Sequence, residues 1–130
     1  YKPVVIIGNL AYVSGHGPVL PDGSMITGRA GDDLDLEGAK VAARQVGLAI
    51  LATLRAQLGS LDRVKRVIKT LGMVNSTPDF VEQPAVINGF SDLIVEVFGD
   101  RGRHARAAVG MATLPRGQSV EIEMIVEVRE

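Results

Sequence analysis

The longest regular pattern of apolar positions runs from Asp35 to Leu58 and predicts a helix. Apolar residues recur there every three or four positions and form one stripe on a helical surface. Asp35 suits the start of this helix and Gly59 its end, because a short acceptor side chain favours the first position and a residue free to adopt positive φ the last. Many residues of the segment are small, so we expect the helix to lie close against a sheet.

A second helix is predicted over Val86 to Phe98, where apolar residues again fall on one stripe. The apolar run Leu93 to Val97 has high β propensity and also fits a strand, so the pattern by itself leaves both interpretations open. The segment Gly99 to Gly102 ends the element in either case.

Short runs that alternate apolar and polar residues, or that are rich in β-branched residues, predict strands at both ends and in the middle of the chain. Their ranges are Lys2 to Gly8, Leu10 to Gly15, Asp62 to Val74, Arg106 to Leu114 and Val120 to Val128, with a brief further strand at Met25 to Arg29. In the middle strand, strict alternation would place Val64, Arg66, Ile68 and Thr70 on one face.

This order of strands and helices predicts an α+β fold, with two helices on one face of a mixed sheet. Several strands carry apolar residues on both faces, so the face without helices needs another cover. We therefore expect a homo-oligomer. The 130 residues fit a single domain, 1–130.

Composition narrows the classes of function. The net charge is −1 and aromatics make up 4% with no Trp, which argues against binding to nucleic acid or to an anionic membrane surface. The absence of Cys excludes disulfides, thiolate nucleophiles and Cys-based metal sites, and it fits a cytoplasmic protein. The longest apolar stretch is too short to span a bilayer, and no signal peptide is visible.

Two groups of charged residues are candidates for chemistry. Glu121 and Glu123 share one face of the last strand, which fits either a solvated strand face or a general base at an interface. Arg106 follows Arg101 and Arg103, which we assign to a solvated loop. The small neighbours of Arg106 leave room for its guanidinium to hold a carboxylate with two hydrogen bonds.

Other combinations are weaker. Ser14 or Ser91 with His16 or His104 shows no recognisable triad spacing, so we interpret any such pair as chance. Two His and no Cys give no metal motif, and the acidic residues before the first helix lack the spacing of a calcium loop.

Motifs along the whole chain resemble those of the RidA/YjgF family, the reactive-intermediate imine deaminases. The resemblance rests on these segments: Gly8-Asn9-Leu10, Val13-Ser14-Gly15-His16-Gly17-Pro18, Gly59-Ser60-Leu61-Asp62-Arg63-Val64, Val74-Asn75, Asp79-Phe80, His104-Ala105-Arg106-Ala107-Ala108-Val109, Leu114-Pro115 and Val120-Glu121-Ile122-Glu123. The stretch from Asn88 to Arg106 is similar to a sub-branch of the family.

The resemblance implies a chorismate-mutase-like fold and a homotrimer whose sites lie between subunits. It implies an enzyme that hydrolyses enamines and imines, such as 2-aminoacrylate, to 2-keto acids and ammonia, without cofactor or metal. By position in the family motifs, Arg106 would bind the substrate carboxylate. Glu121 would hold and activate a water molecule together with the backbone carbonyl of Ala108. The positions expected to line the substrate are Tyr1, Ser14, Gly15 and Asn88.

The chain departs from the archetypal members at several positions. Ala108 stands where the best-known members carry Cys, and His16 replaces a common Gln. Two other functions remain open on the sequence. One is a non-catalytic trimer that binds small carboxylic metabolites in the same cleft. The other is the endoribonuclease or translation-inhibitor activity of some relatives, which the charge and the few aromatics disfavour.

Overall fold

The computed structural model describes all 130 residues and contains two long helices and five strands. The helices are α1 (Leu36–Leu58) and α2 (Gln83–Phe98). The strands are β1 (Val4–Ile7), β2 (Leu10–His16), β3 (Val64–Asn75), β4 (Ala105–Met111) and β5 (Val120–Val128). Short 3₁₀ turns are found at Leu61–Arg63, Gly99–Gly102 and Pro115–Gly117.

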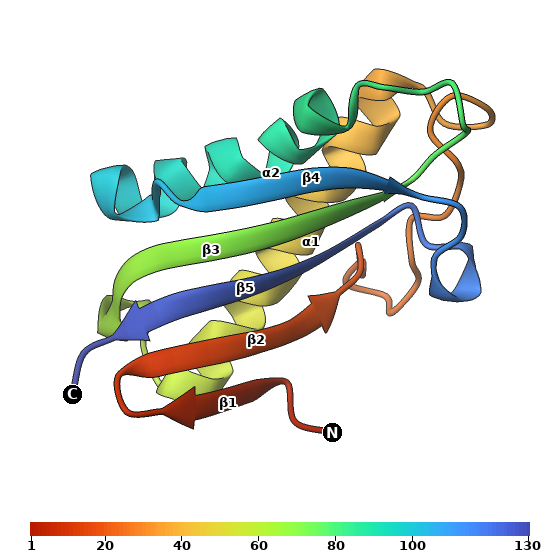
Figure 1. Cartoon of the computed structure of the whole chain (residues 1–130). Helices are drawn as coiled ribbons and strands as arrows, with labels where there is room; N and C mark the ends of the chain where they lie inside the picture. The colour runs from red at the N-terminus through yellow and green to blue at the C-terminus, as the bar shows by residue number, and fades with distance from the viewer.

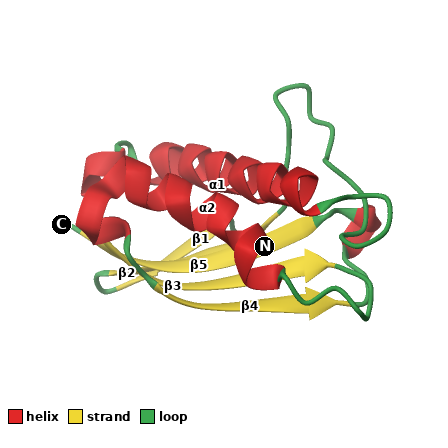
Figure 2. Ribbon diagram, turned by 90° about the horizontal axis from the view of Figure 1, so that it is seen from above, coloured by secondary structure: helices red, strands yellow, loops and turns green.

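The strands form one mixed sheet in the order β1-β2-β5-β3-β4 (Figure 1). Only β3 and β4 run parallel, and the other neighbours are antiparallel. Both helices lie on the same face of the sheet, as Figure 2 shows from above. The expected α+β architecture is therefore confirmed, and β4 is an edge strand.

The caps of α1 confirm the boundaries predicted for the first helix. The Asp35 side chain accepts a hydrogen bond from the Gly38 backbone N–H at 2.7 Å. At the other end, Gly59 has a left-handed φ of 85° and its N–H donates to the Arg55 carbonyl. A side chain at this position would be strained, so the chain turns off the helix here.

Small residues in α1 and α2 allow the two helices to pack closely against each other, in addition to the packing of α1 against the sheet. A Cβ at Gly47 of α1 would stand 2.8 Å from Leu93 of α2, and a Cβ at Gly89 of α2 would collide with the Lys40 carbonyl of α1. Two glycines thus let the helices approach closely. The prediction of contact with the sheet alone was incomplete.

The second predicted helix forms, and it starts earlier than expected, at Gln83. Its apolar stripe buries Val86, Ile87, Phe90, Leu93, Ile94 and Phe98, so burial of this stripe decides against the strand interpretation. Met25 to Arg29, in contrast, forms only isolated bridges, for example between Thr27 and Gln118, and the brief strand predicted there was wrong.

Strict alternation along β3 was also wrong. The register with β5 shifts between Val64 and Arg66 and again between Val67 and Lys69. As a result Val64, Val67 and Thr70 all face the core, at intervals of three. Irregularities of this kind bend a strand and change which side chains it buries.

Strand β5 alternates as predicted. Its apolar residues Val120, Ile122, Met124, Val126 and Val128 are buried beneath the helices. The carboxylates of Glu121, Glu123 and Glu127 therefore belong to the face without helices. No helix is long and apolar enough to cross a membrane.

Candidate functional site

Arg106 lies on the edge strand β4, and helix α2 holds its guanidinium. Its Nη1 donates to Asn88 Oδ1 at 2.9 Å and to Ser91 Oγ at 3.0 Å, and its Nη2 donates to the Pro84 carbonyl at 3.2 Å. A guanidinium has five N–H donors. The remaining two, one on Nε and one on Nη2, match the number that a bidentate carboxylate accepts.

Asn88 therefore contacts Arg106, as expected for two residues of one site. Ala108 was expected to act together with Glu121, but the structure places it on the same face of the sheet as Arg106. Arg106 pairs with Thr70 of β3 and Ala108 pairs with Gly72, so both positions share the face under the helices. Ala108 packs partly against the core.

Ser91 and His104 form a hydrogen-bonded pair next to Arg106, so chance was the wrong interpretation for this one combination, although the other ring nitrogen of His104 meets a backbone carbonyl rather than the carboxylate of a triad. His104 Nε2 lies 2.9 Å from Ser91 Oγ, and His104 Nδ1 lies 2.7 Å from the Gly102 carbonyl oxygen. Burial lowers the pKa of His104 below its ordinary value of 6.5, and the nearby Arg106 charge lowers this pKa further, although the Gly102 bond opposes both. Spacing in sequence gave no sign of this pair, because the helix and the edge strand bring it together. We call Arg106, Asn88, Ser91 and His104 the Arg106 cluster.

Arg101 and Arg103 were assigned to a solvated loop, and this is wrong for Arg101. Its Nη1 donates to the Val64 carbonyl at 2.6 Å, and its guanidinium lies 5.8 Å from the centre of the Phe98 ring. Arg101 thus ties the turn after α2 to β3. Arg103 is exposed and pairs with Asp100 at 3.4 Å.

Glu121 lines a hollow of about 620 Å³ at the opposite side of the sheet. We call this cavity the Glu121 hollow. Four predicted site residues line it together, namely Tyr1, Ser14, Gly15 and Glu121. Further lining residues include His16, Arg116 and Gln118.

The carboxylate of Glu121 has one polar partner and one close backbone neighbour. Gln118 Nε2 donates to Oε1 at 2.6 Å, and Gln118 is itself buried. Oε2 lies against Gly15, where a Cβ would stand only 2.5 Å away. The absence of a side chain at Gly15 therefore makes room for this carboxylate.

An irregularity in β2 places Gly15 there. The register between β2 and β5 shifts between Val13 and His16. His16 fastens this segment to α1, because its Nδ1 lies 2.7 Å from the Ser14 carbonyl and its Nε2 lies 2.8 Å from Thr53 Oγ1. The two bonds hold the backbone on either side of Gly15.

Ser14 also fixes the segment that carries Tyr1. Its Oγ donates to the Lys2 carbonyl at 2.7 Å, and its N–H donates to the Pro3 carbonyl at 2.9 Å. Tyr1 is fully exposed and lies at the rim of the Glu121 hollow. The hydroxyl proton of Ser14 is thus already donated to a backbone carbonyl of the same chain.

Sequence reasoning did not single out Gln118 or Arg116. Gln118 follows Arg116, whose φ of 59° is the single positive value outside the glycines. This turn directs the Gln118 side chain inward, where it contacts Glu121. The turn Pro115-Arg116-Gly117, which ends four residues before the candidate carboxylate of Glu121, was the one signal available in the sequence.

The Arg106 cluster and the Glu121 hollow do not meet within one chain. The guanidinium of Arg106 points toward α2, whereas Glu121 alternates with buried Val120 and Ile122 and faces away from the helices. Strand β3 also separates β4 from β5, which corresponds to roughly 10 Å. The predicted residues therefore form two separate groups on opposite faces of the sheet.

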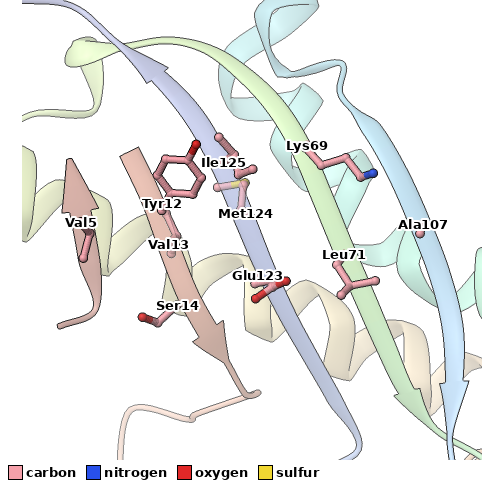
Figure 3. A pocket seen from close by; sticks show the side chains of 10 residues that line it. All are labelled: Val5, Tyr12, Val13, Ser14, Lys69, Leu71, Ala107, Glu123, Met124 and Ile125. Atoms are coloured by element: carbon pink, nitrogen blue, oxygen red, sulfur yellow. The ribbon is translucent and has the colours of Figure 1, made fainter. Parts of the chain in front are cut away.

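A second cavity, of about 480 Å³, opens on the helix-free face (Figure 3). Tyr12, Lys69, Leu71 and Glu123 contribute side chains to it, and Ser14 lines both this cavity and the Glu121 hollow. Glu123 and Glu121 therefore line different cavities, although both lie on one face of β5.

No group of three or more His, Asp or Glu residues is arranged to hold a metal ion.

Comparison with known proteins gives matches over the whole chain. A family described as "YjgF/chorismate mutase-like, putative endoribonuclease" matches residues 1–127. Protein TCP17 of Trypanosoma cruzi is 47% identical over 128 residues, which are 98% of this chain and 80% of that protein. The crystal structure of Atu1372, a protein of unknown function from Agrobacterium tumefaciens, is 52% identical with a TM-score of 0.96, covering 98% of this chain and 82% of that one. RidA from the Antarctic bacterium Psychrobacter is 30% identical with a TM-score of 0.68, covering 98% and 88%.

Proposed function

The chain belongs to the YjgF/chorismate mutase-like family, and from this premise we propose that it hydrolyses 2-imino acids to 2-keto acids and ammonia. The observation that carries the proposal is the guanidinium of Arg106, which α2 fixes with three hydrogen bonds and which keeps two donors unused. A fixed guanidinium with a free pair of donors suits a small planar carboxylate.

The reaction places modest demands on the protein. The C2 carbon of a protonated imine is already electrophilic, so the site must orient the substrate, hold a water molecule and accept a proton. Arg106 would hold the substrate carboxylate. Glu121 would take a proton from water as the water oxygen bonds to C2, which gives a carbinolamine, and it would return that proton to the nitrogen. As the C–N bond breaks and ammonia leaves, the hydroxyl proton of the carbinolamine would pass through the Glu121 carboxylate to the departing ammonia, so that C2 becomes the carbonyl carbon of the 2-keto acid.

Arg106 and Glu121 can act on the same substrate molecule only if they come from two different copies of the chain. Arg106 and Glu121 lie on opposite faces of the sheet in one chain, so the proposed site joins the Arg106 cluster of one copy to the Glu121 hollow of another. The helix-free face carries the half-exposed apolar residues Val5 and Tyr12, whose burial would stabilise such an assembly. We propose the homotrimer implied by the family resemblance.

The RidA name of the Psychrobacter relative supports this proposal. The family description also contains the word endoribonuclease. RNA binding finds less support in this chain, because its net charge is −1 and it has two Tyr, three Phe and no Trp.

The direct test is hydrolysis of a 2-imino acid generated by an amino-acid oxidase, with semicarbazide as the trap. We expect the protein to remove imine faster than the trap does, and Arg106→Ala to abolish this effect. If the protein and the variant both leave the trapping rate unchanged with several amino acids, the proposed catalysis is contradicted, and the alternative of a non-catalytic binder of carboxylic metabolites is favoured.

Mixing of inactive variants tests the position of the site between copies. We expect Arg106→Ala and Glu121→Gln, each inactive alone, to recover about a quarter of wild-type activity when they are refolded together at equal amounts, because about one interface in four then combines two intact halves. Recovery would be absent if one chain supplied both residues. Each variant mixed with itself is the control.

A further inference from the structure

Ser91 lies between a base and a cation, and the direction of each hydrogen bond can be assigned. The Gly102 carbonyl oxygen only accepts, so the proton of neutral His104 resides on Nδ1. Nε2 then offers a lone pair to Ser91 Oγ, 2.9 Å away. The Ser91 hydroxyl donates to His104 and accepts from Arg106 Nη1 at 3.0 Å.

This arrangement diverts Ser91 from its usual partner. A serine inside a helix commonly donates its hydroxyl to a backbone carbonyl one turn back. Here the lone pair on His104 Nε2 attracts the proton, which turns the oxygen lone pairs of Ser91 toward the guanidinium of Arg106. Asn88 accepts from the same nitrogen at 2.9 Å, so both hydrogens of Nη1 are held.

The surroundings of His104 favour its neutral form. The imidazole packs edge-on against the Phe90 ring with centroids 5.9 Å apart, and burial and the Arg106 charge both lower its pKa. The other charged groups around it are Asp92 and Arg103, which line the same shallow hollow of about 360 Å³.

Arg103 is occupied elsewhere in this arrangement. Its side chain pairs with Asp100 at 3.4 Å, and its carbonyl accepts from Arg66 of β3. Neither Asp92 nor Arg103 makes a hydrogen bond to the imidazole, so Arg106 is the charge that acts on His104 most directly.

We propose that Ser91 and His104 are positioning residues that set the plane of the Arg106 guanidinium for the substrate carboxylate. The inference rests on the proposed function for the identity of the ligand, but the hold on Arg106 exists in the free protein. Ser91 acts directly on Arg106, and His104 acts through Ser91. The pair therefore governs the affinity for the carboxylate rather than proton transfer at C2.

The first measurement uses the ligand-free protein. Nitrogen-15 NMR reports rotation of the Arg106 guanidinium and the protonated nitrogen of His104, and the chain has only two His to assign. We expect slow rotation and a proton on Nδ1 in the wild type, faster rotation in Ser91→Ala, and slow rotation again in Ser91→Thr. Asp92→Asn is the matched control, because Asp92 lines the same hollow and makes no hydrogen bond to Arg106.

The second measurement compares 2-oxobutanoate with its uncharged amide as ligands. We expect Ser91→Ala to weaken binding of the acid roughly tenfold, the loss typical of one hydrogen bond to a charged group, while binding of the amide is unchanged. His104→Gln should give a smaller loss of the same kind, and Ser91→Thr should restore the wild-type ratio. In turnover, KM should rise with little change in kcat.

Two results would overturn the inference. One is an Arg106 signal that Ser91→Ala leaves unchanged, and the other is an equal loss of affinity for acid and amide, which would indicate a merely structural role. A wild type that binds acid and amide equally would instead contradict Arg106 as the carboxylate anchor in the proposed function. The rotation of Arg106 still decides the positioning role in that case.

Discussion

The Arg106 cluster and the Glu121 hollow hold their charged groups by different means. Three acceptors from one helix fix Arg106, so its position depends on how α2 packs. Glu121 has one donor, Gln118, and otherwise has space because Gly15 lacks a side chain. The cation is thus oriented by the number of its hydrogen-bond acceptors, whereas the carboxylate is oriented mainly by the space left around it.

The largest effect should come from removing the proton acceptor alone. We expect Glu121→Gln to lower kcat for imine hydrolysis by about a hundredfold or more, because an amide accepts no proton from water. Affinity for 2-oxobutanoate, measured by calorimetry, should stay within about twofold of the wild type, since Arg106 anchors that ligand. A loss of affinity as large as that of Arg106→Ala would show that the Arg106 cluster and the Glu121 hollow do not divide their tasks in this way.

A matched pair of glycine substitutions distinguishes the packing of α2, which positions Arg106, from the space at Gly15, which accommodates Glu121. Gly89→Ala should lower the free energy of unfolding by about 1–3 kcal/mol, because its Cβ meets the rigid Lys40 backbone and displaces α2 together with Asn88. Gly15→Ala should cost less stability, since its Cβ meets only the movable end of Glu121, yet it should still reduce turnover. Urea titrations and imine kinetics on both variants check this. Equal stability losses would remove the distinction.

The donor to Glu121 should have an intermediate effect. Gln118→Met keeps the volume of this buried side chain and removes the hydrogen bond to Oε1. We expect kcat to fall about tenfold, the value of one hydrogen bond to a charged group, with KM little changed. Steady-state kinetics measure both constants. A rise in KM without a fall in kcat would place Gln118 in substrate binding instead.

The smallest effect concerns pH and the Arg106 cluster. The pKa of His104 is lowered in the folded protein, so the unfolded chain binds a proton more readily than the native one. The corresponding stability is therefore complete above about pH 6.5, the ordinary histidine value, and is lost as the pH falls through the lowered pKa. Thermal melts between pH 7.5 and about 5 should show this decline, and His104→Gln should flatten it. His16→Gln is the control, and an equal flattening there would reject His104 as the source.

Sequence patterns predicted the elements whose signals are local. The stripe and caps of α1, and the alternation of β5, follow from the residues themselves, and both appear in the structure. The shifts of register in β3 could not be predicted, because they depend on how β5 pairs with it. The missing strand at Met25 to Arg29 has a similar cause, since bridges to distant residues compete with local propensity.

The candidate site likewise has residues that the sequence indicated and residues that only the folded structure shows. The family motifs pointed to Arg106, Glu121 and the residues around them, and the structure gathers these residues into two separate groups. Ser91 was set aside as a chance partner of a histidine and Gln118 was not singled out, because their contacts come from tertiary packing and from a turn with positive φ. A resemblance finds residues that a family shares, whereas hydrogen bonds of this kind become visible only when the chain is folded.

The separation of Arg106 and Glu121 by the sheet has a consequence for how the proposed activity scales with abundance. In the proposed assembly a solitary copy would hold half of each reaction centre, so turnover per molecule would fall on dilution once copies dissociate. Kinetics would then be of higher than first order in protein at low concentration, and first order only when assembly is complete. The protein concentration in the cell would then have to exceed the level needed for assembly before the proposed activity could be observed.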